Sequence, residues 1–200
     1  MNINKAIRKQ QKSYKRFMLI MCFIFFIIPA ILIYTKKLSL FYIVYAGIIQ
    51  FLIIISMLVK QHNEHIKFEI IENYRLYIEL GLFKKKINML CDKIEIVHAE
   101  NFKRKSDGKE DFEIIMITSS KFRNEYVVPV NAKLFKLHPY VAHCYKKRKV
   151  LHPEKSYFFT IIKKGKLHKY LLLDMIYKRC VNAEFTYEAI DRIKEYRESL

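Results

Sequence analysis

Two long stretches without a charged side chain lie in the N-terminal third of the chain. They are residues 17–34 (FMLIMCFIFFIIPAILIY) and residues 38–59 (LSLFYIVYAGIIQFLIIISMLV). At 1.5 Å per residue the first stretch forms a helix about 27 Å long, close to the roughly 30 Å of hydrocarbon in a bilayer. Its Ile, Leu and Phe residues each favour insertion by about 0.3–0.6 kcal/mol. The pattern therefore predicts a hairpin of two transmembrane helices rather than a buried hairpin of a soluble protein.

The first stretch differs from a cleaved signal peptide. Like a signal peptide, it follows a basic segment, residues 1–16. Its apolar run is too long, however, and it ends in Tyr34-Thr35-Lys36 instead of the small residues that precede a cleavage site. We therefore expect an uncleaved hairpin.

Lysine and arginine residues beside the two stretches predict the orientation of the hairpin. The basic residues at its outer ends are Lys5, Arg8, Lys9, Lys12, Lys15, Arg16, Lys60, Lys67 and Arg75, and those in the connecting turn are Lys36 and Lys37. Cytoplasmic segments of membrane proteins carry the excess of lysine and arginine. The count predicts a multi-pass protein of the cell membrane with both termini in the cytoplasm.

Two residues inside the stretches need hydrogen-bond partners. Pro29 cannot donate a backbone hydrogen bond, so it frees a carbonyl of the first helix. Gln50 is the only side-chain amide in either stretch, and such an amide usually bonds to a neighbouring helix. We expect Gln50 to make an interhelical polar contact. A transport role is the alternative, but neither stretch contains the ionisable residues of an ion relay.

The pattern changes to a period of two residues after the second stretch. Apolar and polar residues alternate from Ile66 to Ile70 and again from Leu76 to Leu82, which is typical of half-buried strands. Two further apolar segments, FEIIMITSS and EYVVPV, precede a helical pattern at residues 134–149. The order of elements predicts an α+β membrane protein, in which a small antiparallel β barrel or sandwich with a capping helix spans residues 60–149.

Residues 150–200 are predicted to form a separate helical tail. Apolar residues recur at three- and four-residue steps from Leu167 to Cys180, and Thr186 can cap a last helix. The apolar face either packs on the β domain or forms a surface for a partner or a second copy. The segment YFFTII (157–162) is compatible with both helix and strand.

The β region resembles a known class of domain. The run from Leu76 to Phe83 (LYIELGLF), a short basic strand and the step from Lys93 to Val97 (KIEIV) are similar to the pleckstrin-homology-like (PH-like) domains of bacterial membrane proteins, which often follow paired transmembrane helices. The resemblance covers residues 66–149. It departs at Met89-Leu90-Cys91, where the family tends to have a proline. The resemblance implies a bent barrel capped by a helix and no enzymatic activity, while phosphoinositide binding does not transfer with a fold.

Basic residues gather at two places in this domain and are the candidate contact residues. They are Lys84, Lys85 and Lys86 on one strand and Lys103, Arg104 and Lys105 in one loop. A domain that follows the second span directly lies at the anionic inner leaflet, which attracts each basic residue by roughly 1 kcal/mol. Strand geometry points Lys84 and Lys86 one way and Lys85 toward the inner face, as a rim residue. The residues therefore contact anionic lipid or a partner, or else they are solvated lysines that protect a strand edge.

The positive charge does not favour nucleic acid. The formal net charge is +18, but attraction to phosphate alone is salt-sensitive and unspecific. The sequence contains no nucleic-acid recognition motif beside that charge.

No motif for catalysis, a cofactor or a metal accompanies these features. Cys22, Cys91, Cys144 and Cys180 form no Cys-x-x-Cys pair, and the segment His62-Asn63-Glu64-His65 lacks the spacing of zinc-protease helices. The four glycines form neither a phosphate loop nor a dinucleotide-binding fingerprint. We therefore expect no catalytic residue, no metal and no cofactor.

Together these patterns predict a non-enzymatic integral membrane protein. It would present a basic PH-like domain at the inner leaflet as a scaffold or regulatory interaction module. Its expected partners are anionic lipids and a protein or second copy, bound through the hairpin or the helical tail. The alternative is an accessory subunit of a membrane export, conjugation or transport complex.

Overall fold

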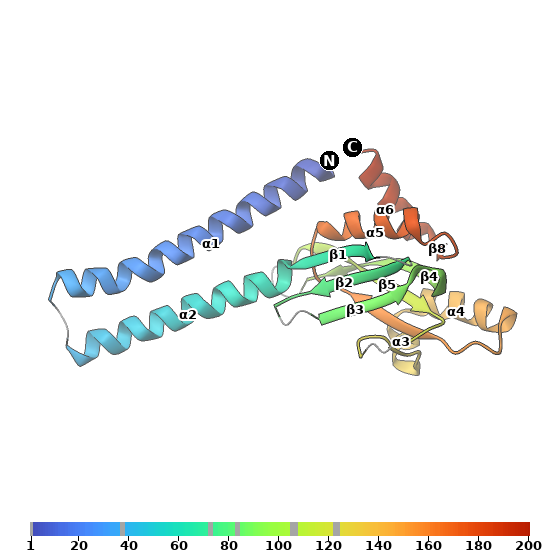
Figure 1. The fold of residues 1–200 in the computed structure, drawn as a ribbon, viewed down its shortest axis with the longest axis horizontal. Helices are drawn as coiled ribbons and strands as arrows, with labels where there is room; N and C mark the ends of the chain where they lie inside the picture. The colour runs from blue at the N-terminus through green and yellow to red at the C-terminus, as the bar shows by residue number, and fades with distance from the viewer. Residues whose placement is uncertain (1, 37–38, 72–73, 83–84, 105–107, 122–124) are drawn as a thin grey trace.

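The computed structural model describes residues 2–36, 39–71, 74–82, 85–104, 108–121 and 125–200. Two long helices, α1 (Ile3–Tyr34) and α2 (Leu40–Glu64), extend as a hairpin from a mixed α+β domain (Figure 1). Both helices are long and apolar enough to cross a membrane. In the most apolar part of α1 no residue is buried, and in that of α2 only 11 % are. Their apolar surface is therefore not covered by the rest of the described chain.

Helix α1 begins far before the apolar stretch and reaches the domain. The side chain of Asn2 caps it by accepting a hydrogen bond from the backbone N–H of Lys5 at 2.9 Å. Ile3 and Ile7 are buried in the main core of the domain. Residues 3–16 of the predicted basic N-terminus are thus the first part of α1, which packs on the domain at its start.

The strands form two sheets. The first contains β1 (Ile66–Ile71), β2 (Arg75–Leu80) and β3 (Lys85–Leu90) in antiparallel order. The second has the order β6-β7-β5-β4-β8, with bounds β4 (Ile94–Lys103), β5 (Glu110–Thr118), β6 (Val128–Pro129), β7 (Phe158–Ile162) and β8 (Glu184–Phe185). Strand β8 runs parallel to β4, and the other pairs are antiparallel.

Of the two predicted arrangements, a barrel or a sandwich, the barrel is wrong. Across the described ranges neither sheet closes on itself. A short 3-10 helix, η1 (Cys91–Lys93), separates β3 from β4, and β4 then pairs with β5 and β8 instead of extending the first sheet. The domain consequently has two open sheets rather than one bent barrel.

Helices cover both faces of the five-stranded sheet. Helices α3 (Ala132–Leu137) and α4 (Pro139–Leu151) contribute to a core on one face. Helices α5 (His168–Arg179) and α6 (Tyr187–Arg197), together with the three-stranded sheet, contribute to the main core on the other. Both faces of β5 are buried, and its residues 114–117 (IIMI) are accordingly a continuous apolar run rather than an alternating one.

The predicted helix at residues 134–149 is two helices, because the chain turns at His138. Pro139 occupies the first turn of α4, where its missing N–H costs no intrahelical bond. Pro139 therefore begins the longer of the two helices.

Residues 150–200 are not a purely helical tail. The segment whose structure the sequence left open is strand β7, which lies between β6 and β5 in the sheet. Strand β8 also comes from this part of the chain. The second sheet therefore needs residues from both sides of the predicted boundary at residue 149.

The contact of α1 with the core gives a testable prediction. Replacing Ile3 and Ile7 together by serine should lower the free energy of unfolding by about 3–6 kcal/mol, because each buried isoleucine contributes about 1.5–3 kcal/mol. The measurement is urea unfolding of the full chain in detergent micelles, followed by circular dichroism. The control is Lys9→Ser on the exposed side of α1, which should change the free energy of unfolding by less than about 0.5 kcal/mol. Equal midpoints for both variants would contradict the packing of α1 on the domain.

Candidate anion-binding site at the junction of the hairpin and the domain

The predicted basic residues do not all lie in one place. Lys85 and Lys86 are exposed at the start of β3, and the Lys85 ammonium lies 5.0 Å from the centre of the Tyr126 ring. Lys103 is exposed at the end of β4, whereas Arg104 is partly buried beside Asp111. Lys84 and Lys105 lie outside the described residues.

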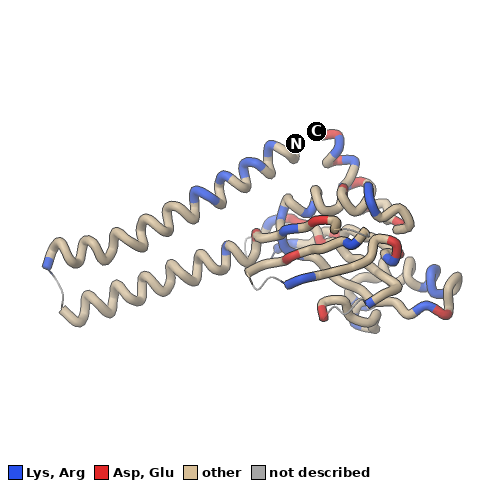
Figure 2. Tube along the Cα trace, in the orientation of Figure 1, with Lys and Arg blue, Asp and Glu red and all other residues tan. Residues whose placement is uncertain are grey.

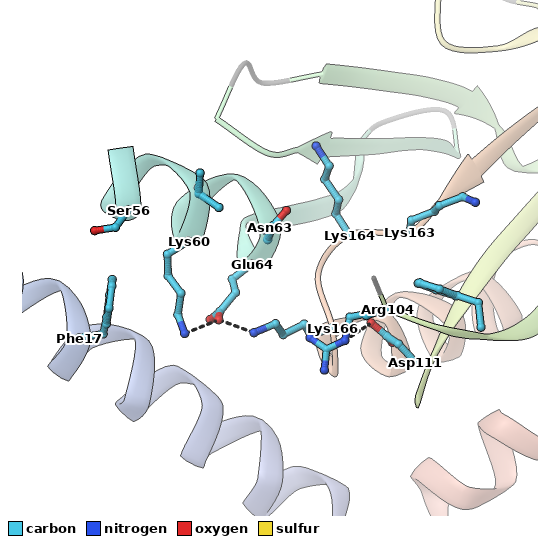
Figure 3. Close-up of a pocket in the computed structure, with 12 residues that line it drawn as sticks. Phe17, Ser56, Lys60, Asn63, Glu64, Arg104, Asp111, Lys163, Lys164 and Lys166 are labelled. Carbon is cyan, nitrogen blue, oxygen red and sulfur yellow. Dashed lines mark hydrogen bonds and ion pairs between the residues drawn. The ribbon is translucent and has the colours of Figure 1, made fainter. Parts of the chain in front are cut away.

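Arg104 belongs instead to a pocket that the sequence did not predict. The pocket has a volume of about 640 Å³ and lies where α1, α2 and the domain meet (Figure 3). Its basic residues are Lys60, Arg104, Lys163, Lys164 and Lys166, and its acidic residues are Glu64 and Asp111. Two sequence signals mark it: Lys60 directly follows the second apolar stretch, and KKGK at 163–166 is a basic turn.

Two glycine turns fix the end of α2 against the domain. Gly165 has φ +101°, and a Cβ there would lie 2.6 Å from Cγ2 of Ile66. Its backbone N–H donates to the carbonyl of Asn63 at 3.2 Å. Gly81 has φ +68°, and a Cβ there would lie 2.7 Å from Nδ1 of His62. Only glycine fits such close approaches at positive φ, so the last turn of α2 is held on two sides.

Glu64 joins two of the pocket lysines. Its Oε1 accepts from Nζ of Lys60 at 3.0 Å and from Nζ of Lys166 at 2.6 Å. The Glu64 side chain is only 7 % exposed, so the carboxylate is held between the two ammonium groups. Lys60 comes from α2 and Lys166 from the turn before α5, so this ion pair network connects the hairpin to the domain.

Asp111 holds a second pair of cations. Its Oδ1 accepts from the buried Lys169 at 2.7 Å, and its Oδ2 lies 3.6 Å from Nε of Arg104. Lys169 also donates to the carbonyls of Phe112 and Lys163. Burial lowers the pKa of Lys169, and the Asp111 carboxylate opposes that shift. The ion pair with Asp111 is thus what makes a fully buried lysine tolerable here.

The other two pocket lysines, Lys163 and Lys164, point away from Glu64 and Asp111 (Figure 3). Lys163 Nζ lies 2.8 Å from Oε2 of the buried Glu113. Lys164 Nζ is in hydrogen-bond contact with Nε2 of His62, whose Nδ1 accepts from the backbone N–H of Leu82. Burial, followed by the nearby charge of Lys85, lowers the pKa of Lys164. Lys163 and Lys164 therefore interact with Glu113 and His62 rather than with Glu64 and Asp111.

Gln50 of α2 contacts α1 at a backbone carbonyl. Its Nε2 donates to the carbonyl of Phe25 in α1 at 3.3 Å. Residue 25 lies four positions before Pro29, so this is the carbonyl that Pro29 leaves without its helical partner. The amide of one helix thus satisfies the backbone defect of the other.

One group of side chains has the composition of a metal site. Ligand atoms of Glu100, Glu113 and His138 lie within 4.8 Å of one another. However, Nδ1 of His138 lies 2.5 Å from Glu100 and its Nε2 lies 3.6 Å from Glu113, so each ring nitrogen faces a carboxylate. We assign this group a structural role, joining the α3–α4 turn to the sheet.

All four cysteines are free, and two of them are buried together. The hydrogen bond with Cys91 and burial raise the pKa of Cys180. A thiol with a raised pKa stays protonated and unreactive at neutral pH. Cys180 is therefore a structural residue of the core.

Comparison of the chain with protein-family models, with curated proteins and with solved structures finds no match. What the chain shows is two long apolar helices followed by a mixed β-sheet domain with a basic pocket at the junction.

Proposed function

We propose that this protein is a non-enzymatic integral membrane protein that holds a basic domain at the cytoplasmic face of the membrane, as a scaffold or regulatory interaction module. The observation that carries the proposal is the connection between hairpin and domain. Helix α2 ends at Glu64 and β1 begins at Ile66. A single residue cannot act as a flexible linker, so the domain stays next to the bilayer.

The distribution of charge supports the cytoplasmic side. Figure 2 shows basic residues along the half of α1 nearest the domain, while the apolar lengths of both helices carry none. The start of α1 and the end of α2 both lie at the domain. The positive-inside rule then favours the cytoplasm for this end of the hairpin.

The resemblance to bacterial PH-like domains supports the proposal only through its general arrangement. A β domain that follows paired helices and lacks catalytic motifs is the expected form of an interaction module. We therefore propose that binding, and not catalysis, is what this domain does.

An accessory subunit of a membrane export, conjugation or transport complex is the second candidate. The apolar faces of α1 and α2 are uncovered, so they are available to a larger membrane protein as well as to lipid. Purification in mild detergent distinguishes the two: the scaffold should elute alone or as copies of itself, and the accessory subunit with other chains in fixed stoichiometry.

The orientation is tested by labelling single cysteines on intact cells. In a background with Cys22→Ala and Cys144→Ala, the two buried cysteines are retained because they are inaccessible. A membrane-impermeant maleimide should label Lys36→Cys in the turn of the hairpin but not Lys133→Cys on α3, which is exposed. Both should react after permeabilisation. Labelling of Lys133→Cys on intact cells would overturn the cytoplasmic placement.

The predicted lipid contact of the strand lysines is tested in lipid nanodiscs. Anionic lipid should slow hydrogen exchange at residues 85–90 relative to neutral lipid, and high salt should remove the difference. Lys85→Glu with Lys86→Glu should abolish it, because each lysine contributes roughly 1 kcal/mol of attraction. Lys133→Glu with Lys136→Glu makes the same charge change on α3 and should not. If the strand variant keeps the difference, these lysines are a solvated edge.

A further inference from the structure

We propose that the junction pocket binds the phosphate group of an anionic phospholipid of the inner leaflet. Lys60, Lys166 and Arg104 would surround the phosphate, with the lipid chains lying along the apolar wall. This proposal rests on the proposed placement of the domain at the inner leaflet and adds a defined site and ligand to it.

The depth of the pocket matches the headgroup layer. Phe17 opens the first apolar stretch and Val59 closes the second, and both line the pocket. From Ser56 to Glu64, α2 rises about 12 Å. A headgroup layer is about 5–7 Å thick on each side of the hydrocarbon. The pocket therefore extends from the edge of the hydrocarbon through the layer that contains the phosphates.

The membrane side of the pocket is apolar. Phe17 and Val59 line it, and Figure 3 shows Phe17 and Ser56 at the end away from the domain. The Ser56 hydroxyl already donates to the carbonyl of Ile53 at 2.8 Å, so it presents no unsatisfied donor. A water-soluble anion would leave this wall uncovered, whereas the chains of a lipid would cover it.

The domain side offers donors that are already positioned. Figure 3 shows Lys60 and Lys166 directed toward each other, with the Arg104 guanidinium beside them. Glu64 fixes the two ammonium groups, and each ammonium has three N–H donors, of which Glu64 takes one. Asp111 lies farther from the guanidinium, with its Oδ2 3.6 Å from Nε of Arg104. The two ammonium groups are thus held in place before a phosphate binds, which lowers the ordering cost of binding.

The charge and size of the pocket favour one phosphate. Lys60, Lys166 and Arg104 face Glu64 and Asp111, whereas Lys163 and Lys164 point away from them (Figure 3), so the centre of the pocket has one net positive charge. The volume of about 640 Å³ lies within the range of small-molecule sites, roughly 300–1,000 Å³. A headgroup with the first carbons of its chains fits this space.

The test uses the full chain, delipidated in neutral detergent, with native mass spectrometry to count bound lipids. Phosphatidylglycerol should bind at one per chain, and phosphatidylcholine should bind at least tenfold more weakly. Lys60→Gln with Lys166→Gln should weaken phosphatidylglycerol binding by about tenfold or more, because two charge-assisted contacts are lost. Lys133→Gln with Lys136→Gln removes the same charge from α3 and should leave binding within about twofold.

A second variant guards against a folding defect. Removing both lysines leaves the nearly buried Glu64 without these partners, so Lys60→Gln, Glu64→Gln and Lys166→Gln are also combined. This variant removes the carboxylate together with the lysines and should fold, as judged by circular dichroism, and still bind weakly. Unchanged phosphatidylglycerol binding in the folded triple variant overturns the site.

Competition with inorganic phosphate tests whether the pocket binds the phosphate of a lipid or a free phosphate ion. It should compete with phosphatidylglycerol only at concentrations far above those of the lipid, and Val59→Ala should weaken lipid binding without changing phosphate binding. Competition at equal concentration would overturn the lipid assignment. If phosphatidylglycerol does not bind but the cysteine experiment places the domain in the cytoplasm, the pocket proposal alone is rejected. If the cysteine experiment places the domain outside the cell, the proposed function is rejected.

Discussion

Replacing Lys169 by methionine should lower the free energy of unfolding of the domain by about 3–5 kcal/mol, the usual cost of removing one partner of a buried ion pair. The Lys169 side chain is fully buried, and that of Asp111 is only 8 % exposed. The substitution leaves this carboxylate in a low-dielectric site without its nearest cation. It also removes the donor to the carbonyls of Phe112 and Lys163. Unfolding in urea of the full chain in detergent micelles measures the change.

The same helix supplies the control for this experiment. Lys178 also forms an ion pair on α5, with Asp174 at 2.6 Å, but its side chain is 57 % exposed. Lys178→Met should therefore change the free energy of unfolding by less than about 1 kcal/mol. Adding Asp111→Asn to Lys169→Met should recover part of the loss, because a neutral amide is less costly to bury than a carboxylate. Similar losses for both single variants would show that burial of the Lys169 pair is not what matters.

Replacing Gly165 by alanine should destabilise the junction by about 2–5 kcal/mol. A left-handed backbone costs a residue with a Cβ about 1–2 kcal/mol. At φ +101° the added methyl would also lie 2.6 Å from Ile66 Cγ2, and overpacking costs typically 1–3 kcal/mol. The turn at residues 163–166 should move away from the end of α2, which would separate Lys166 from Glu64. Urea unfolding and hydrogen exchange at residues 63–68 report the two effects.

Gly108 separates the two causes of this loss. It has φ +63°, but a Cβ there would meet no atom within 4 Å among the described residues. Gly108→Ala should therefore show the backbone cost alone, about 1–2 kcal/mol. If Gly165→Ala is no worse than Gly108→Ala, the contact of the turn with Ile66 does not hold the junction.

Local patterns were sufficient for much of the fold. The two apolar stretches correspond to the apolar parts of α1 and α2, because helix length and hydropathy are properties of contiguous residues. Pro29 and Gln50 were each recognised as needing a partner, although only the packing of α1 on α2 pairs them through the Phe25 carbonyl. Alternation of apolar and polar residues likewise matches β2, whose inner residues are buried in turn.

Pairing between strands that are distant in the chain could not be predicted from the sequence. The resemblance suggested a barrel, but β7 enters the second sheet beside β5, and β8 pairs in parallel with β4. A strand of two residues such as β8 has no periodicity to detect. Its partner is selected by the position of α5 and α6, which is a tertiary property.

For the candidate site too, local features could be predicted from the sequence and long-range contacts could not. The sequence by itself determined that the chain has two apolar spans and a strongly basic remainder, because composition and periodicity are read along the chain. Only the tertiary structure decided which cations act together: Lys60 and Lys166 are far apart in sequence, yet both contact Glu64. The predicted cluster followed sequence neighbours, whereas a charge interacts with whatever lies within a few ångströms. The folded backbone sets those distances, and for this pocket the turns at Gly81 and Gly165 set them by fixing α2 against the domain.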